Sequence, residues 1–486
     1  MSGRRLAAAL VLGAVTLAGC TGPGASPGPS ADSPSAPGSF YAQRLTWTPC
    51  GRLECATASV PLDHADPTGR TLTLPLARRK ATAAPRRGTL FVNPGGPGVS
   101  GTWFAAAFDR RDLEAYDIVG WDPRGVAAGA RVTCLDAAAA DRFDEVDFSP
   151  DDAGELGALR AATASFAAAC AAHTDPALLA HLSTRETARD LDILRAAVGD
   201  DRLTFYGASY GTLIGAHYAD LFPDRVGRMV LDAPVDVTGA EEVSQAAGFE
   251  ASFRAFAAWC GGRPDCPLGD DGDAVAATLL GWLDGLDAAP PAVGARRLTQ
   301  SLAALGMARH LYAGEEGWPR LLAAVTAARA GDPRRLLAAA DAMNGRNGDG
   351  TRDPLQASGA AIRCADRAAR PWAEALARWE AERVAFPFGS LLGPDLGCLD
   401  WPVVAPAWTT PRGAGAPPLL LVAATGDPAT PYPWAEATAR ALGSAVLLPV
   451  ESGAHVRYGG DPCATAAVRD YLLAGRLPAA ASRCST

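Results

Sequence analysis

The sequence is nearly without lysine. Lys80 is the only lysine among 486 residues, and arginine supplies the other fixed positive charges. A serine–lysine dyad or a lysine Schiff base is therefore confined to that one position. The formal net charge is −9, and no cluster of basic residues stands out in the sequence. Because binding to nucleic-acid phosphates needs a basic surface, nucleic acid is not an expected partner.

Histidine and long apolar segments are also scarce. The chain has six histidines, so few side chains are available as a general base at neutral pH. Beyond the N-terminal region, no apolar run is long enough to cross a bilayer. The cysteines form no C-x-x-C pair, which argues against a zinc site. We expect neither a metal nor an organic cofactor.

The N-terminus has the pattern of an export signal. Arg4-Arg5 precedes the compact apolar run Leu6–Ala18, and Leu17-Ala18-Gly19-Cys20 resembles a bacterial lipobox. In signals of this kind the leader is cleaved before the cysteine, which then receives a lipid. An ordinary signal peptide that happens to end in cysteine is the alternative. We predict a lipoprotein signal over residues 1–20, lipidation of Cys20, a membrane anchor and an exported protein, either at the cell surface or secreted.

The remaining cysteines support export. With Cys20 set aside, the total of 11 leaves an even number, and an even set in an exported chain suggests disulfides. Connectivity does not follow from sequence, but pairing in chain order closes the shortest loops. That hypothesis gives Cys50–Cys55, Cys134–Cys170, Cys260–Cys266, Cys364–Cys398 and Cys463–Cys484.

Short apolar strands alternate with helices in two parts of the chain, residues 41–236 and 402–486. A Gly/Pro/Ser-rich linker over residues 21–40 precedes the first part. Between the two parts, residues 237–401 are rich in Ala, Leu and Arg, which indicates an inserted helical cap. The predicted fold class is α/β, with a mostly parallel sheet covered by helices on both faces. Predicted strands are 71–77, 88–93, 117–121, 203–206, 228–232, 418–423 and 445–450; predicted helices are 184–198, 213–222, 434–442 and 465–473.

The strongest motif is Gly207-Ala208-Ser209-Tyr210-Gly211, a G-x-S-x-G sequence between a predicted strand and a predicted helix. Such an elbow exposes the serine hydroxyl on a tight turn, and the two glycines let strand and helix approach closely. The following helix directs its positive N-terminal dipole at the charge that develops during attack. The motif predicts Ser209 as the nucleophile of an α/β-hydrolase fold.

His455 is the predicted base. The chain order of this fold is nucleophile, acid, histidine. This order excludes the histidines that precede the serine, His64, His173 and His181. Of those that follow, His217 lies on the helix after the elbow and His310 lies in the expected cap. His455 follows strand 445–450, at the carboxyl end of the sheet where ligands bind in such folds.

Asp427 is the predicted acid. It follows strand 418–423 in the turn Thr425-Gly426-Asp427-Pro428. There it would fix the tautomer of the histidine and stabilise the imidazolium form. Asp400 has no apolar strand before it, and Asp461 comes after the histidine. Asp232, at the end of its own strand, is a more serious rival, because some relatives of this fold place the acid there.

A glycine-rich loop, Asn93-Pro94-Gly95-Gly96-Pro97-Gly98, follows strand 88–93 and is expected to form the oxyanion hole. The N–H groups of Gly96 and Tyr210 are the predicted donors. Residues 96–101 also match G-x-G-x-x-G, and Asp122 lies near the spacing of a ribose-binding acid, so a dinucleotide site is an alternative. Pro97 argues against it, because proline lacks the N–H that a phosphate loop would use there.

Together these motifs resemble the tripeptidyl aminopeptidases related to prolyl iminopeptidase, which have a TAP-like C-terminal region. The resemblance runs from about residue 41 to the end. It implies a capped α/β-hydrolase with Ser209, Asp427 and His455 as the triad, acting on peptide substrates. It further implies release of short peptides, tripeptides in that family, from a free N-terminus. Its most specific segments are Asn93–Gly101, Tyr116–Gly125, Gly207–Gly211, Ile362–Asp366 and Gly426–Tyr432.

Cleavage from a free N-terminus implies an acidic site for the substrate ammonium group. The candidates in the cap are Glu241, Glu242, Glu250, Glu315 and Glu316, although a solvated acidic surface is the better explanation for any one of them taken singly. A carboxylesterase or lipase is an alternative function, because the triad does not fix the substrate. A binding lipoprotein without catalysis is an alternative of another class.

Overall fold

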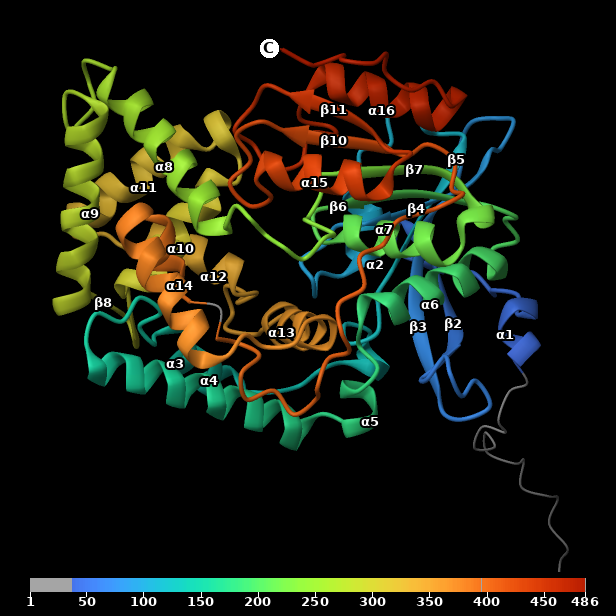
Figure 1. Ribbon diagram of the computed structural model, residues 1–486, viewed down its shortest axis with the longest axis horizontal. Helices are drawn as coiled ribbons and strands as arrows, with labels where there is room; N and C mark the ends of the chain where they lie inside the picture. Colours follow the sequence, from blue (N-terminus) through green and yellow to red (C-terminus); the bar gives the residue numbers. More distant parts are fainter. Residues whose placement is uncertain (1–36, 395, 486) are drawn as a thin grey trace, which may run out of the picture. The chain divides into compact units, whose positions relative to one another are not determined.

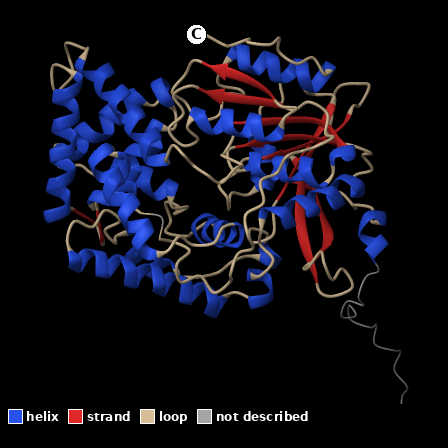
Figure 2. Ribbon diagram, viewed as in Figure 1, coloured by secondary structure: helices blue, strands red, loops and turns tan. Residues whose placement is uncertain are grey.

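The computed structural model describes residues 37–394 and 396–485, and a twisted sheet forms the core of its right half in the view of Figures 1 and 2. The strand order is β1-β2-β3-β5-β4-β6-β7-β10-β11. Strands from β5 to β11 pair in parallel, whereas β1, β2 and β3 form an antiparallel edge. The strand bounds are β1 Thr48–Cys50, β2 Leu53–Pro61, β3 Thr71–Arg79, β4 Gly88–Asn93, β5 Tyr116–Trp121, β6 Leu203–Ala208, β7 Val226–Asp232, β10 Leu420–Ala424 and β11 Val446–Val450.

Helices cover both faces of this sheet. Because side chains alternate across a strand, Leu421 packs on one face with α6, α7 and α15, while Leu420 packs on the other with α2 and α16. Both leucines are fully buried. The predicted α/β class with helices on both faces is therefore confirmed. The covering helices are α2 Gly101–Ala107, α6 Thr184–Ala197, α7 Gly211–Leu221, α15 Tyr432–Leu442 and α16 Pro462–Ala474.

A second, helical region has its own apolar core, built around Phe253, Leu279 and Met307. It lies between β7 and β10 in the chain, where the cap was expected, and a short hairpin of β8 (Ala292–Val293) and β9 (Arg296–Arg297) joins it. The boundaries at residues 237 and 401 stay a prediction. The helices of this stretch are α8 Gln245–Gly261, α9 Gly272–Ala288, α10 Gln300–Leu311, α11 Trp318–Arg329, α12 Arg334–Met343, α13 Leu355–Asp366 and α14 Trp372–Ala385. Of these, α13 packs into the core of the sheet rather than into the separate helical core.

Helices between β5 and β6 contact this helical region, which the sequence did not indicate. Arg352 forms ion pairs with Asp141 and Asp144 of α3, and Ser301 accepts the Phe148 N–H at 2.8 Å. These helices are α3 Ala137–Asp144, α4 Ala153–His173 and α5 Pro176–Leu179.

Helix α1 (Pro37–Ala42) begins a few residues before the expected start near Tyr41, and Phe40 is buried.

Disulfides join the cysteines in chain order, as hypothesised: Cys50–Cys55, Cys134–Cys170, Cys260–Cys266, Cys364–Cys398 and Cys463–Cys484. Within the described ranges, no helix has the length and apolar character needed to cross a bilayer.

Candidate active site

Ser209 occupies the turn between β6 and α7 in a strained conformation. Its φ is 55°, in the left-handed region that residues other than glycine rarely adopt. The Ser209 N–H donates to the Asp232 carbonyl on the neighbouring strand at 2.9 Å. A Cβ atom on Gly207 would lie 2.4 Å from the Gly211 carbonyl oxygen, so the flanking glycine permits this tight turn. The geometry is that of a nucleophile elbow.

His455 and Asp427 form a buried hydrogen-bonded pair. The His455 Nδ1 lies 2.8 Å from Asp427 Oδ2 and 3.0 Å from Oδ1. Asp427 also accepts the N–H groups of Ala429 (2.8 Å) and Thr430 (3.0 Å) and the Thr430 hydroxyl (3.1 Å). These donors fix the carboxylate, and a proton on Nδ1 leaves Nε2 of His455 as the basic nitrogen. Burial lowers the pKa of His455, but the charge and hydrogen bond of Asp427 outweigh it, so the pKa is raised.

Asp232 links the elbow to the loop that carries His455. Its backbone carbonyl holds Ser209, and its carboxylate accepts the N–H groups of Arg457 (3.0 Å) and Tyr458 (2.8 Å). The Tyr206 hydroxyl donates to the same carboxylate at 2.8 Å. Burial raises the pKa of Asp232, against the lowering effect of these donors. This rival acid therefore binds the backbone after the histidine and makes no hydrogen bond to its ring.

The other rival acids lie away from the histidine ring. Asp461 accepts the Ala464 N–H at 2.7 Å as the N-cap of α16, and Asp400 is exposed in a turn. Of the four aspartates considered from the sequence, Asp427 alone contacts the His455 imidazole in the described part of the chain.

The glycine-rich loop after β4 packs against the elbow. A Cβ atom on Gly95 would lie 2.6 Å from the Ala208 carbonyl oxygen and 2.9 Å from the Tyr210 nitrogen. The Gly95 N–H donates to Asn93 Oδ1 at 2.9 Å, so this amide is already engaged. The next amide, that of Gly96, and the Tyr210 N–H have no acceptor among residues 37–394 and 396–485. These two groups are free to bind an oxyanion.

Contacts within the protein account for the G-x-G-x-x-G spacing of this loop. Asp122 accepts the Ser100 hydroxyl at 2.7 Å and the Thr102 N–H at 3.0 Å, which ties it to the start of α2. A Cβ atom on Gly98 would lie 2.7 Å from the Leu355 carbonyl oxygen of α13. The glycine thus allows a helix to cover the loop, in the place where a dinucleotide phosphate would approach the backbone.

Tyr312, which the sequence did not indicate, packs directly on the histidine. Its carbonyl accepts the His455 N–H at 2.8 Å, and its ring meets the imidazole edge-on with centroids 5.2 Å apart. Burial raises the pKa of Tyr312 to about 12, so the ring is neutral at physiological pH. No local motif predicts this contact, because Tyr312 belongs to a turn between α10 and α11, far from His455 in the chain. Thr430 was also missed, although it lies within the same turn as Asp427.

The Tyr210 side chain connects the elbow to helix α13. Its hydroxyl lies 2.6 Å from Thr184 Oγ1, and Thr184 donates from Oγ1 (2.5 Å) and from its N–H (2.6 Å) to Asp366. Burial raises the pKa of Asp366 to about 6. Asp366 ends the segment Ile362–Asp366 noted in the sequence, so this segment lies behind the candidate oxyanion hole.

The cap glutamates have different surroundings. Glu241 pairs with Arg367, and Glu250 pairs with Arg254 and accepts the Phe388 N–H at 2.7 Å. Glu315 accepts the Gly453 N–H at 3.2 Å, in the loop that leads to His455. Glu315 is exposed, as are the remaining two, Glu242 and Glu316.

Known proteins resemble this chain over most of its length. Serine protease Hip1 of Mycobacterium tuberculosis is 33% identical over 91% of each chain. Tripeptidyl aminopeptidase of Streptomyces lividans is 31% identical over 89% of this chain and 84% of its own. Carboxylesterase B of Mycobacterium tuberculosis is 34% identical over 100% of this chain and 98% of its own. The family model described as TAP-like protein matches residues 385–484.

These relatives are at least 31% identical to the chain over most of its length, and the sheet has the mostly parallel order of an α/β-hydrolase. The chain therefore belongs to the TAP-like family of α/β-hydrolases and is a serine hydrolase.

Proposed function

We propose that this protein is a serine exopeptidase that releases short peptides, tripeptides in particular, from the free N-terminus of its substrates. The observation that supports this chemistry is the hydrogen bond between Asp427 and His455. Asp232 connects the loop of His455 to the Ser209 elbow, because it binds the backbone of both. The resemblance to tripeptidyl aminopeptidase supports the substrate class.

The proposed mechanism uses an acyl-enzyme. The Ser209 hydroxyl attacks the peptide carbonyl while His455 Nε2 takes its proton, and the N–H groups of Gly96 and Tyr210 bind the oxyanion. His455 then protonates the leaving amine as the C–N bond breaks. Water, activated by His455, hydrolyses the ester and restores Ser209.

Glu315 is the proposed site for the substrate ammonium group. It lies beside the His455 loop, where the Gly453 N–H occupies only part of its hydrogen-bonding capacity. Glu241 and Glu250 already have arginine partners, which neutralise their charge. We expect Glu315→Gln to raise KM for substrates with a free amine and to leave kcat for ester substrates unchanged.

The test compares one chromogenic tripeptide amide with its N-blocked form, using wild type and Ser209→Ala. Cleavage of the free form alone is expected, with loss of several orders of magnitude in kcat for Ser209→Ala. Equal cleavage of both forms would refute the exopeptidase proposal. Full activity of Ser209→Ala would refute the nucleophile assignment, and the absence of fluorophosphonate labelling at Ser209 would favour a binding lipoprotein.

The resemblance to carboxylesterase B favours ester hydrolysis as a second candidate. The same triad acts on both bond types, so the substrate decides between them. Cleavage of a nitrophenyl ester without cleavage of either tripeptide amide would select this function.

We also propose that Cys20 carries a lipid that anchors the protein to a membrane. Cys20 lies outside the described residues, so the proposal rests on the lipobox sequence. The disulfides favour an oxidising compartment, as export requires. Cys20→Ser is expected to move the protein from the membrane fraction to the soluble fraction, and an unchanged distribution would refute the anchor.

A further inference from the structure

A pocket of about 460 Å³ lies at the amino-terminal ends of the central strands. Arg202 of this pocket precedes β6, whereas Ser209 follows it. The pocket and the candidate active site therefore lie at opposite ends of the parallel strands. Its volume is in the range of small-ligand sites. The lining residues are Arg87, Tyr116, Arg202, Thr204, Gly227 and Arg228.

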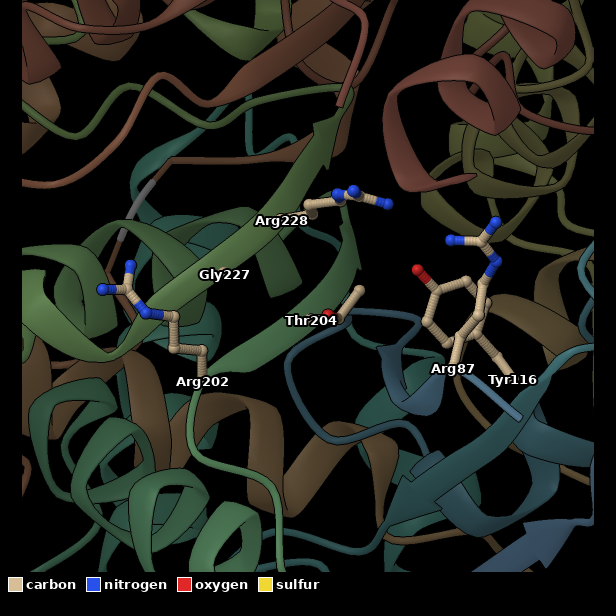
Figure 3. Close-up of a pocket in the computed structure, with 6 residues that line it drawn as sticks. All are labelled: Arg87, Tyr116, Arg202, Thr204, Gly227 and Arg228. Atoms are coloured by element: carbon tan, nitrogen blue, oxygen red, sulfur yellow. The ribbon is translucent and has the colours of Figure 1, made fainter. Parts of the chain in front are cut away.

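The arginines of the pocket have hydrogen-bonding capacity to spare. In Figure 3, Arg87 and Arg228 point toward one another beside the Tyr116 hydroxyl, and Arg202 lies at the other end. Each guanidinium has five N–H donors. Arg87 donates to the Leu473 carbonyl, Arg228 to the Leu472 carbonyl and Arg202 to the Val226 carbonyl.

No carboxylate in the described ranges forms an ion pair with these three arginines, although the chain as a whole is acidic. Neighbouring arginines differ, since Arg86 pairs with Asp117 and Arg225 pairs with Asp192. The nearby carboxylate of Asp200 accepts the Thr89 N–H at 2.8 Å. The pocket therefore offers positive charge without an internal counter-ion.

The chain enters the fold at this same edge. Tyr41 of α1 lies against the Arg225 guanidinium, 5.5 Å from its ring centroid. Arg225 directly precedes β7, and Arg202 of the pocket donates to the first residue of that strand, Val226.

We propose that this pocket binds a phosphate group, from a phospholipid headgroup or from a soluble phosphate compound. The planar guanidinium groups of Arg87 and Arg228 match phosphate oxygens. The Tyr116 hydroxyl donates to the Leu472 carbonyl at 2.6 Å and so serves to line the pocket. The proposal does not depend on the peptidase activity.

The experiment uses the full chain with Cys20→Ser, which removes the lipid acceptor. It compares this protein with a pocket variant (Arg87→Gln with Arg228→Gln) and a charge-matched control (Arg329→Gln with Arg335→Gln), both of whose arginines are exposed in the cap. One arm measures stabilisation against heat by inorganic phosphate relative to chloride at equal ionic strength. The other measures sedimentation with phosphatidylcholine vesicles, with and without phosphatidylglycerol.

Binding in either arm is expected to weaken about tenfold or more in the pocket variant and to persist in the control, because hydrogen bonds between charged groups are lost. If the pocket variant loses binding in both arms, the ligand is a lipid headgroup. If it loses binding in the phosphate arm alone, the ligand is a soluble phosphate compound. The proposal fails if the starting protein binds neither probe, or if both variants lose binding equally. Unchanged melting temperatures without ligand confirm that the variants fold.

Discussion

At the scale of single residues, Asp427 sets both the orientation and the charge state of His455. Its carboxylate receives three donors besides the imidazole, so it is held in place even without the ring. The raised pKa of His455 follows from this buried charge, which outweighs the effect of burial. Because the base must be neutral to act, activity falls as the pH drops through that pKa.

Asp427→Asn should lower kcat by roughly 10³–10⁴-fold, because the amide no longer holds the correct tautomer. It should also move the acid limb of kcat/KM to lower pH, since burial alone lowers the pKa of His455. Profiles of kcat/KM against pH for wild type and variant test both points. The exposed Asp400→Asn serves as control, and an acid limb that stays in place would contradict the role of the charge.

His217 should make the fold sensitive to acid. Its side chain is 3% exposed, Nδ1 has no partner in the described part of the chain, and burial lowers its pKa to about 4. The unfolded state therefore binds more protons between pH 6.5 and 4, so stability is lost as pH falls through this window. The loss is roughly 2 kcal/mol between pH 7 and 5.

His217→Leu cannot titrate, so its free energy of unfolding should rise relative to wild type on acidification by about that 2 kcal/mol. Urea unfolding of both proteins at pH 7 and 5 gives the difference. Titratable groups present in both proteins, including Asp366, contribute equally to the two free energies of unfolding and cancel in their difference. A difference that does not vary with pH would show that the buried imidazole is not the cause.

At the scale of elements, α13 contacts two parts of the candidate oxyanion hole. Its first turn covers Gly98, and its last residue, Asp366, holds Tyr210 through Thr184. Gly98 has a φ of +104°, and a Cβ atom there would lie 2.7 Å from Leu355 O and 3.0 Å from Gly359 N. A side chain at this position must therefore displace the helix.

Gly98→Ala should lower stability by roughly 1–3 kcal/mol and kcat/KM by at least about tenfold, because the displaced helix shifts the Gly96 and Tyr210 amides. Thermal unfolding and steady-state kinetics measure the two effects. Gly129→Ala is the matched control, since nothing lies within 4 Å of its Cβ position. If Gly98→Ala is destabilised but has normal kinetics, the position of α13 does not affect the active site.

At the scale of the whole molecule, the disulfides close loops of very different lengths. Cys134–Cys170 spans 36 residues and joins the segment after β5 to α4, whereas Cys50–Cys55 spans 5 residues across the β1–β2 hairpin. A longer loop restricts the unfolded chain more. Its disulfide should therefore contribute more to stability.

Replacing both cysteines by alanine should cost about 4 kcal/mol for Cys134–Cys170 and about 2 kcal/mol for Cys50–Cys55. Equilibrium urea unfolding of the two double variants provides the comparison. Equal losses would mean that loop closure does not dominate, and that packing of the buried Cys170 matters instead.

The sequence predicted the parts of this protein that depend on local pattern. The elbow of Ser209, the turn of Asp427 and the loop of His455 each follow an apolar strand, and parallel strands bring their carboxyl ends to one edge. The local sequence could not decide whether Asp427 or Asp232 is the acid of the triad, because both aspartates follow strands. Their different hydrogen bonds appear only once the His455 loop is folded over the sheet.

The sequence by itself determined the α/β alternation, the elbow and the even set of cysteines, because these depend on neighbours within a few residues. Only the tertiary structure decided that Tyr312 packs on His455, that Asp366 holds Tyr210, and that Arg87, Arg202 and Arg228 line one pocket at the amino-terminal ends of the strands. Those contacts join segments far apart in the chain. Their partners are chosen by packing, which brings distant side chains together only when the fold is complete.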